Sequence, residues 1–269
     1  MAGVRIPMAQ PDLFSSSYNS AGSTAKPRVV SCILCYNEER KIGPLVEKFK
    51  DPGVEAVVDT VLIIDDGSTD GSVAAIQAAG NPRAVVISHG SNLGPGTAIR
   101  TAYNYAIEHG YDIFTLMAGN GKDDPRNIPP LVAPILEDRA DYVQGSRFTK
   151  GGLSRGLPVH RWIAMKLYTW TFSMALRKRL TDATNGFRAY RISLLTDPRI
   201  DWNQPWLGFS YEIEFYLLFK VNALRFRVAE VPVSKVYDFE KSESYTKVRP
   251  IDWLKNLKPL FLLWFGLRK

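Results

Sequence analysis

Polar residues follow two short apolar runs in a pattern that suits the binding of a nucleotide. Tyr36-Asn37-Glu38 comes after Val29–Cys35, and Asp65-Asp66-Gly67-Ser68 closes the run at 61–64. Carboxylates placed there can accept hydrogen bonds from a base or a ribose, and Gly67 permits close approach of the backbone. An ordinary capped turn between a strand and a helix has the same composition, so these segments alone leave both interpretations open.

The polar segments belong to a repeating pattern of strands and helices. Strands are predicted at residues 29–35, 61–65, 84–88, 113–117 and 142–145, and helices at 40–50, 72–79, 96–109 and 128–138. This alternation predicts an α/β fold, with a doubly wound, mostly parallel sheet and helices on both faces. Ligands bind beyond the carboxyl ends of such strands, so we expect the polar segments to meet at one rim.

The composition limits the classes of binding partner but does not identify one. The 269 residues suffice for one large α/β domain, and 34 Lys+Arg against 27 Asp+Glu give a net charge of +7. That charge suits nucleotide diphosphates or acidic lipids; nucleic acid is not expected, because no zinc-finger spacing, RNP motif or long basic run is present. Cys32 and Cys35 have the spacing of a redox pair or half a zinc site, but in a strand their side chains point to opposite faces. We therefore expect two separate thiols, which suits a cytoplasmic setting.

Further motifs follow in order along the chain. They are Asn92-Leu93-Gly94-Pro95-Gly96, Gly145-Ser146-Arg147-Phe148, Asp182-Ala183-Thr184-Asn185-Gly186-Phe187-Arg188, Glu230-Val231-Pro232-Val233 and Ser244-Tyr245-Thr246-Lys247. With the two segments above, this series resembles the family 2 glycosyltransferases of the GT-A fold, and among them the polyprenyl-phosphate branch typified by dolichol-phosphate mannose synthase. The resemblance covers residues 28–250.

The resemblance implies roles for the matching residues. The substrate-binding positions would be Tyr36, Asn37, Glu38, Asp65, Asp66, Gly94, Gly119, Asn120, Arg188 and Lys247. Of these, Tyr36, Glu38, Asp65 and Asp66 would hold the nucleoside. Arg147 would face the donor diphosphate and Arg188 the acceptor phosphate, because a guanidinium pairs bidentately with phosphate oxygens. Asp182 would lie near the reacting sugar. We expect the catalytic residues to be Asp182, Lys122 and Arg147.

One segment departs from the family pattern. Where most members have Asp-x-Asp followed by Gln, this chain has Ala118-Gly119-Asn120 followed by Lys122. Both carboxylates that would hold Mg²⁺ or Mn²⁺ are missing, so no metal ligand is assigned. Three explanations stay open. Lys122 and Arg147 replace the charge of the metal, or Asn120 with Asp123 or Asp124 binds a metal in a shifted geometry, or the donor is bound without turnover. We favour the first, because a cation is gained where anions are lost.

The expected activity is transfer of a hexose from a GDP- or UDP-linked donor to a polyprenyl phosphate, with inversion. Alternatives are a glycosyltransferase with a soluble sugar or metabolite acceptor, for which Asp182 would act as base, and a non-catalytic subunit that binds nucleotide sugars. An ionised lipid phosphate would need no strong general base. The sequence leaves the nucleotide, the sugar and the oligomeric state undetermined.

Four regions are predicted. They are a flexible tail at 1–27, a nucleotide-sugar-binding half at 28–148, an acceptor-binding half at 149–249, and an amphipathic C-terminal helix at 250–269. A Gly-rich loop is expected at 150–154. The stretches 160–180 and 250–269 each combine Trp and Leu with basic residues, which suits either a helix packed on the domain or one lying on a membrane surface. No signal peptide or spanning helix is predicted, so we expect a cytoplasmic protein that is soluble or peripheral on the membrane.

Overall fold

The computed structural model describes the backbone of residues 26–237 and 250–268, and the side chains of 26–237 and 257–268. Most of the predicted N-terminal tail lies outside the described residues, as do Lys247 and the motif that contains it.

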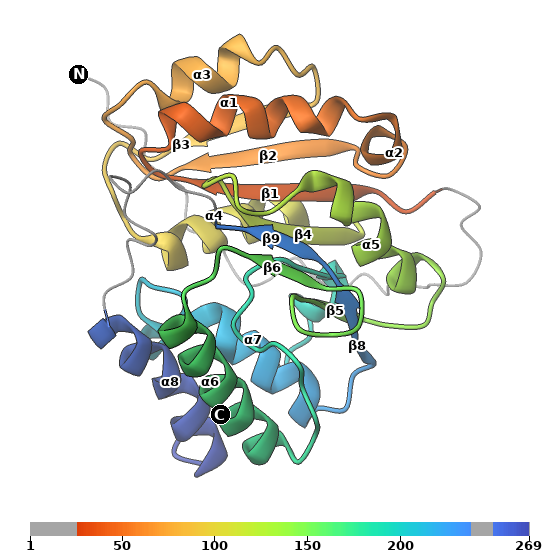
Figure 1. The fold of residues 1–269 in the computed structure, drawn as a ribbon. Helices are drawn as coiled ribbons and strands as arrows, with labels where there is room; N and C mark the ends of the chain where they lie inside the picture. Colours follow the sequence, from red (N-terminus) through yellow and green to blue (C-terminus); the bar gives the residue numbers. More distant parts are fainter. Residues whose placement is uncertain (1–25, 238–249, 269) are drawn as a thin grey trace.

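Strands from the whole described chain join in one large sheet (Figure 1). They are β1 (Val29–Cys35), β2 (Thr60–Asp65), β3 (Ala84–Ser88), β4 (Ile113–Ala118), β5 (Tyr142–Ser146), β7 (Arg188–Arg191) and β8 (Val228–Pro232), in the order β3-β2-β1-β4-β7-β5-β8. A separate pair is formed by β6 (Leu153–Arg155) and β9 (Ser234–Val236), which run parallel. The five predicted strands are confirmed within one residue at each end.

The orientation of β7 decides what reaches the rim of the sheet. β1, β2, β3 and β4 pair in parallel, whereas β7 runs antiparallel to both β4 and β5. Arg188, at the start of β7, lies opposite Leu116 near the end of β4. The start of β7 therefore lies at the same edge as the carboxyl ends of its neighbours, and the segment 182–187 that leads into it joins the rim.

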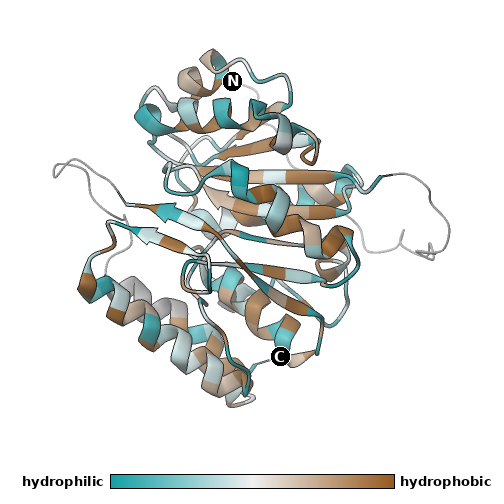
Figure 2. Ribbon diagram, turned by 45° about the vertical axis from the view of Figure 1, so that its right-hand side comes forward, coloured by the Kyte–Doolittle hydropathy of each residue, from teal (hydrophilic) through white to brown (hydrophobic). Residues whose placement is uncertain are grey.

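Helices cover both faces of the sheet, as predicted. They are α1 (Glu39–Glu47), α2 (Pro52–Glu55), α3 (Ser72–Ala78), α4 (Pro95–Glu108), α5 (Ile128–Leu136), α6 (Val159–Leu176), α7 (Glu212–Ala223) and α8 (Pro250–Trp264). One core packs the sheet against α1, α2, α3 and α5, and the other packs it against α4, α6, α7 and α8. Figure 2 shows the brown, hydrophobic strands between these layers. Strands buried on both faces consist of nearly continuous apolar runs, as β1 does.

The two cysteines lie in different cores. Both thiols are free and buried. Cys32 packs in the core under α4 and α7, and Cys35 packs in the core under α1 and α5. Burial raises the pKa of Cys35 to about 12, so its thiol stays protonated. The expectation that the thiols point to opposite faces is confirmed.

Helices α6 and α8 combine a buried and an exposed apolar face. Met165, Tyr168 and Phe172 of α6 are buried in the core. On the outer side of α6, Trp162, Ile163, Leu167, Trp170 and Met174 are exposed. In α8, Leu260 is buried while Phe261 and Trp264 are exposed. The packing of both helices on the domain is confirmed, and their contact with a membrane surface stays a prediction. Among the described residues, no helix combines the length and apolarity needed to cross a bilayer.

Part of the Gly-rich segment predicted as a loop forms β6, because Leu153 pairs with Ser234 of β9. This pairing ties the segment after β5 to residues that follow β8.

Candidate active site

The turns after β1 and β2 are joined by hydrogen bonds. The backbone N–H of Asn37 donates to Ser68 Oγ at 2.9 Å, and Asn37 Oδ1 accepts from the N–H of Thr69 at 2.8 Å. The N–H of Glu38 donates to Ser72 Oγ at 2.8 Å. Asn37 has a left-handed backbone, with φ 52, which asparagine tolerates better than most residues. The segments that contain Tyr36, Asn37, Glu38 and Asp65 therefore meet at one rim, as expected for the carboxyl ends of parallel strands.

Asp66 is engaged within the protein. Its carboxylate accepts from the N–H groups of Leu93 at 3.0 Å and Gly94 at 2.8 Å, and it lies 2.8 Å from His89 Nδ1. It is 5% exposed. In this geometry Asp66 holds the loop that begins α4. Its predicted contact with a nucleoside stays a prediction.

Gly94 has a structural reason to be glycine. Its φ is +87, and a side chain there would overlap the carbonyl oxygen of Phe209. Gly96 donates its N–H to the same oxygen at 2.8 Å. Gly119 is similarly close to β1, since its N–H donates to the carbonyl oxygen of Leu34 at 2.8 Å. Gly94 and Gly96 thus allow the loop before α4 to approach the segment that leads into α7, and Gly119 allows the segment after β4 to approach β1.

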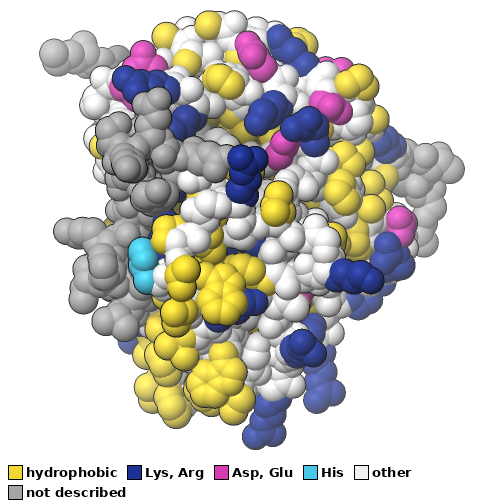
Figure 3. All heavy atoms as spheres, viewed as in Figure 1, with side chains coloured by type: hydrophobic (Ala, Val, Ile, Leu, Met, Phe, Trp, Pro, Cys, Tyr) yellow, Lys and Arg dark blue, Asp and Glu magenta, His cyan; other side chains and the backbone are white. Residues whose placement is uncertain are grey.

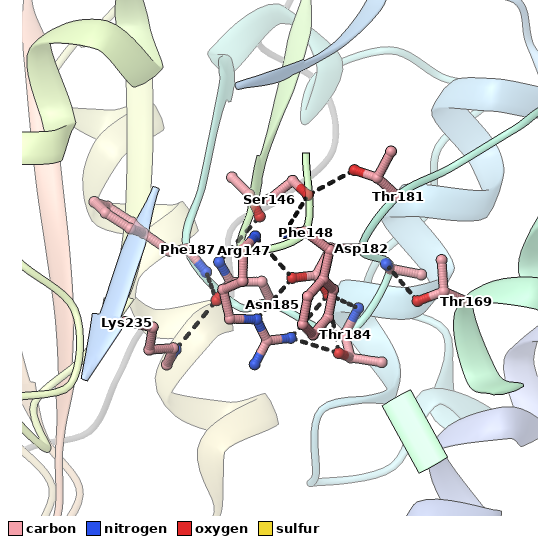
Figure 4. A network of polar contacts seen from close by, with 12 residues as sticks. Ser146, Arg147, Phe148, Thr169, Thr181, Asp182, Thr184, Asn185, Phe187 and Lys235 are labelled. Carbon is pink, nitrogen blue, oxygen red and sulfur yellow. Dashed lines mark hydrogen bonds and ion pairs between the residues drawn. The ribbon is translucent and has the colours of Figure 1, made fainter. Parts of the chain in front are cut away.

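Arg147 and Asp182 form a bidentate ion pair (Figure 4). Arg147 Nε and Nη2 lie 2.7 and 2.8 Å from the two oxygens of Asp182, and the Arg147 N–H donates to the same carboxylate at 3.2 Å. The remaining Nη1 donates to the hydroxyl of Tyr237 at 2.5 Å. Burial alone would raise the pKa of Asp182, but the charge and hydrogen bonds of Arg147 hold that pKa below its ordinary value. Asp182 is therefore ionised.

Three of the predicted motifs meet around this pair. The carboxylate of Glu230, on β8, accepts the N–H groups of Thr181 and Asp182 at 2.9 and 3.1 Å. Ser146, at the end of β5, shares a 2.6 Å hydrogen bond with Thr181. Asp182 is 0% exposed and its carboxylate is bonded to Arg147, and its predicted contact with the reacting sugar stays a prediction.

Arg188 lies in the core. It is 1% exposed and pairs with Glu214 of α7 at 3.1 Å, and its Nη1 donates to the carbonyl oxygen of the same residue at 2.9 Å. Its Nη2 donates to the carbonyl oxygen of Asn185. The guanidinium thus joins β7 to α7 and is not among the residues that line the cavity described next, and its predicted contact with an acceptor phosphate stays a prediction.

A cavity of about 180 Å³ lies beneath the rim. Its apolar walls come from the ends of β1 and β4 and from α6 and α7. Its polar wall includes Asn120, Lys122, Asp123, Arg147, Arg161, Thr184, Glu214, Lys235 and Tyr237. Of the predicted catalytic residues, Lys122 and Arg147 reach this cavity. The segment 118–123, which differs from the family pattern, and Arg147, which is paired with Asp182, thus line the same cavity.

Tyr237 is surrounded by cations. Lys122 Nζ and Arg161 Cζ lie 5.8 and 5.9 Å from the centre of its ring, and Arg147 bonds its hydroxyl. Burial, followed by the charges of Lys235 and Arg161, lowers the pKa of Lys122 to about 7, against the opposing effect of Asp123 and Glu38. An anion bound in the cavity would reverse this balance and favour the charged lysine.

The residues that replace the Asp-x-Asp motif do not fit a divalent metal. Asp123 Oδ2 accepts from Lys235 Nζ at 2.9 Å, and its Oδ1 is buried with no hydrogen-bond partner among the described residues. Asp124 is used elsewhere, as the N-cap of the short helix at Pro125–Asn127. Across the described part of the chain, no three His, Cys, Asp or Glu side chains are grouped closely enough to hold a metal. One carboxylate oxygen beside Lys122 and Lys235 is a poor donor set for Mg²⁺ or Mn²⁺, which prefer several anionic oxygens.

Several residues of the cavity were missed from the sequence, among them Lys235 after β8 and the three described here. Arg161 lies on the inner side of α6, Glu214 lies in α7, and Tyr237 ends the described segment after β9. Burial raises the pKa of Glu214, although Arg188 opposes the shift. Helical spacing places Arg161 on the same side of the helix as Met165 and Tyr168, and this pattern could have predicted that Arg161 faces the protein interior.

Comparisons with known proteins agree with this geometry. The family model described as glycosyl transferase family 2 matches residues 31–197. The undecaprenyl-phosphate mannosyltransferase of Micrococcus luteus is 30% identical over 215 residues, which cover 78% of this chain and 84% of that protein. The polyprenol monophosphomannose synthase of Mycolicibacterium smegmatis is 28% identical over 220 residues, 79% of each protein. The chain therefore belongs to glycosyl transferase family 2 and is a glycosyltransferase.

A solved structure supports the fold. Glucosyl-3-phosphoglycerate synthase from Mycobacterium tuberculosis, in complex with Mn²⁺, UDP and glucosyl-3-phosphoglycerate, matches with a TM-score of 0.62 and 20% identity over 90% of this chain and 81% of that one. The mostly parallel sheet with helices on both faces is thus a GT-A fold.

Proposed function

We propose that this glycosyltransferase moves a hexose from a GDP- or UDP-linked donor to a polyprenyl phosphate at a membrane surface, with inversion. The observation that carries the proposal is the cavity in which Lys122, Arg147, Arg161 and Lys235 converge next to buried Asp182. A site with this charge suits a reaction that brings two phosphate-bearing substrates together. The names of the relatives in Micrococcus luteus and Mycolicibacterium smegmatis support a polyprenyl-phosphate acceptor.

The ionised state of Asp182 favours a phosphate acceptor over a hydroxyl acceptor. Both oxygens of Asp182 are bonded by Arg147, which lowers its pKa and makes it a weak base. A lipid phosphate is already ionised and needs no strong base, whereas a sugar hydroxyl does. Asp182 then orients Arg147, and Arg147 orients a phosphate group in the cavity.

Lys122 would replace the metal as the stabiliser of the leaving diphosphate. Negative charge grows on the diphosphate as the glycosidic bond breaks, and a preorganised cation lowers the cost of that charge. Support comes from the position of Lys122 in the wall of the cavity and from the poor metal-donor set around it. No step of the proposed reaction requires Mg²⁺ or Mn²⁺.

The exposed apolar faces of α6 and α8 would place the enzyme on the bilayer. Figure 3 shows a yellow apolar patch over these helices, and its exposed members include Leu167, Trp170 and Trp264. An apolar surface that carries Trp beside basic residues suits the interface between lipid head groups and acyl chains. Because α6 also lines the cavity, the site would lie close to a lipid-borne acceptor.

Transfer should be measured with a panel of nucleotide sugars and polyprenyl phosphate in detergent, with EDTA or with added Mn²⁺. Transfer to the lipid phosphate that survives EDTA is expected. Transfer that occurs only with Mn²⁺ would support the polyprenyl-phosphate acceptor but would reject the proposal that Lys122 replaces the metal. Transfer to soluble sugars alone would replace the proposal with the soluble-acceptor alternative. Tight binding of a nucleotide sugar with no transfer would indicate a binding subunit.

A further inference from the structure

A second hollow lies outside the cavity, between α6 and α8. It has a volume of about 750 Å³. Its lining includes Lys166, Trp170, Arg177, Lys178, Arg179 and Trp264. In Figure 3, dark blue side chains gather beside the yellow patch at the lower edge of the molecule. We call this hollow the basic groove.

The basic groove has a strong charge of one sign. Four of its lining residues are cations, and none of the described lining residues is acidic. The carboxylates of Asp182 and Glu230 are close enough to oppose the lowering of the pKa of Lys166 by burial. Asp182 is bonded to Arg147, and Glu230 accepts backbone N–H groups, so both are already engaged. The groove therefore attracts an anion from outside.

The dipole of α6 explains only part of this arrangement. Cations are favoured at the C-terminal end of a helix, which accounts for Arg177, Lys178 and Arg179. Lys166, however, lies within α6, with its Nζ 4.0 Å from the centre of the Phe148 ring, and Trp264 comes from α8. Burial lowers the pKa of Lys166, a cost that a bound anion would offset.

The surroundings of the groove identify the kind of anion. Trp170 is 60% exposed and Trp264 is 43% exposed, and the apolar face of α6 and α8 continues beyond them. A free nucleotide or inorganic phosphate would leave this apolar rim in water. A phospholipid would place its phosphate among the cations and its acyl chains along the rim.

We infer that the basic groove binds the head group of an anionic phospholipid of the bilayer on which α6 and α8 dock. This inference rests on the proposed membrane docking and is independent of the donor and the acceptor. It adds a lipid site separate from the cavity, since Arg147 lines the cavity while its neighbour Phe148 lines the groove.

The test uses the full chain and vesicles of phosphatidylcholine with or without phosphatidylglycerol. The variant Arg177→Asn/Lys178→Gln/Arg179→Gln removes three exposed cations, and Asn is chosen because Arg177 has a left-handed backbone with φ 49. The control Lys48→Gln/Arg126→Gln/Arg139→Gln removes three charges from exposed positions on other elements. Each cation near an anionic surface contributes about fivefold in affinity, so we expect the groove variant to lose roughly a hundredfold on anionic vesicles. The control should lose far less, and binding to neutral vesicles should be unchanged in both.

Two results would overturn the inference. One is a control that loses as much affinity as the groove variant, which would show that net charge alone is responsible. The other is a raised KM of the groove variant for polyprenyl phosphate in neutral detergent micelles, which would assign the groove to the acceptor. Failure of the proposed function has a different signature: the wild type would transfer no sugar to polyprenyl phosphate, yet would still prefer anionic vesicles through the groove.

Discussion

Arg147 and Asp182 are joined by two side-chain hydrogen bonds of 2.7 and 2.8 Å, although they lie 35 residues apart in the sequence, and both are buried. Removing one partner would leave the other charge buried and unpaired, which costs about 3–5 kcal/mol. We expect Asp182→Asn to lower the free energy of unfolding by that amount, measured by denaturant titration. The exposed pair Arg139–Glu137 provides the control, where Glu137→Gln should cost about 1 kcal/mol or less. Equal losses in the two variants would contradict a buried, ionised pair.

Lys122 should make donor affinity depend on pH. The pKa of its ammonium is about 7 in the free protein, so the cation that attracts a diphosphate is present below pH 7 and is lost above it. A bound diphosphate raises that pKa, and between the two pKa values each pH unit should weaken binding by up to tenfold. Calorimetry with a nucleotide sugar from pH 6 to 9 measures the slope. Lys122→Arg should bind with little slope, and an unchanged slope in Lys122→Gln would assign the titration to another group.

Restoring the Asp-x-Asp motif should allow Mn²⁺ to supply the positive charge that Lys122 supplies in the wild type. Lys122→Gln should lower kcat by roughly 10²–10³-fold in EDTA, the size of effect seen when a preorganised transition-state contact is removed. Adding Ala118→Asp and Asn120→Asp to that variant supplies two anionic oxygens, and activity should then return with Mn²⁺. Initial rates with and without Mn²⁺ decide the matter. A Lys122→Gln enzyme with wild-type activity in EDTA would remove lysine from the mechanism.

Gly94 should not tolerate a side chain. Gly94→Ala would combine a φ of +87 with an overlap on the Phe209 carbonyl oxygen, and we expect a loss of about 1–3 kcal/mol in the free energy of unfolding. Gly90 is the matched control, because a Cβ there would meet nothing within 4 Å. Thermal unfolding of both alanine variants makes the comparison. A Gly94→Ala protein as stable as Gly90→Ala would show that the loop before α4 adapts.

The outer face of α6 should bind vesicles without supporting the fold. Leu167 and Trp170 are 61% and 60% exposed, so Leu167→Ser and Trp170→Ser should leave unfolding unchanged and weaken binding to neutral vesicles by about tenfold each. Leu136→Ser, at the exposed end of α5, is the control and should leave vesicle binding unchanged. Sedimentation with vesicles measures the affinity. If Leu136→Ser and Trp170→Ser behave alike, docking through α6 is excluded.

The sequence predicted the elements that have a strong pattern. β1 to β5 were found because each is an apolar run followed by polar residues, and α4 because its apolar residues recur at helical spacing. β7 was missed because its four residues are too few to show the alternation of a strand. It also begins at the end of the motif 182–188, which was interpreted as a binding motif and not as a strand. α7 was missed because it is buried around its whole circumference, including Glu212 and Glu214, and so has no polar face.

The sequence predicted site residues that stand in motifs, but not the contacts that depend on tertiary packing. Lys122 and Arg147 were predicted and both line the cavity. The burial of Arg188 was not predicted: its role at an acceptor phosphate was carried over from the family motif, whereas its pairing with Glu214 depends on a helix that had not been predicted. The charge around Lys122 comes from Arg161 and Lys235, whose approach depends on the packing of α6 and on the pairing of β9.

The order of strands restricts how substrates enter. β7 and β8, from the predicted acceptor-binding half, are hydrogen-bonded to β4 and β5 from the predicted nucleotide-sugar-binding half. The two halves therefore cannot rotate apart as rigid bodies about a hinge, since such a motion would break the ladders of one continuous sheet. Exchange of donor and product has to use rearrangements of side chains and connecting segments at the rim, so evolution of a new specificity in this chain would act on those segments while the sheet stays unchanged.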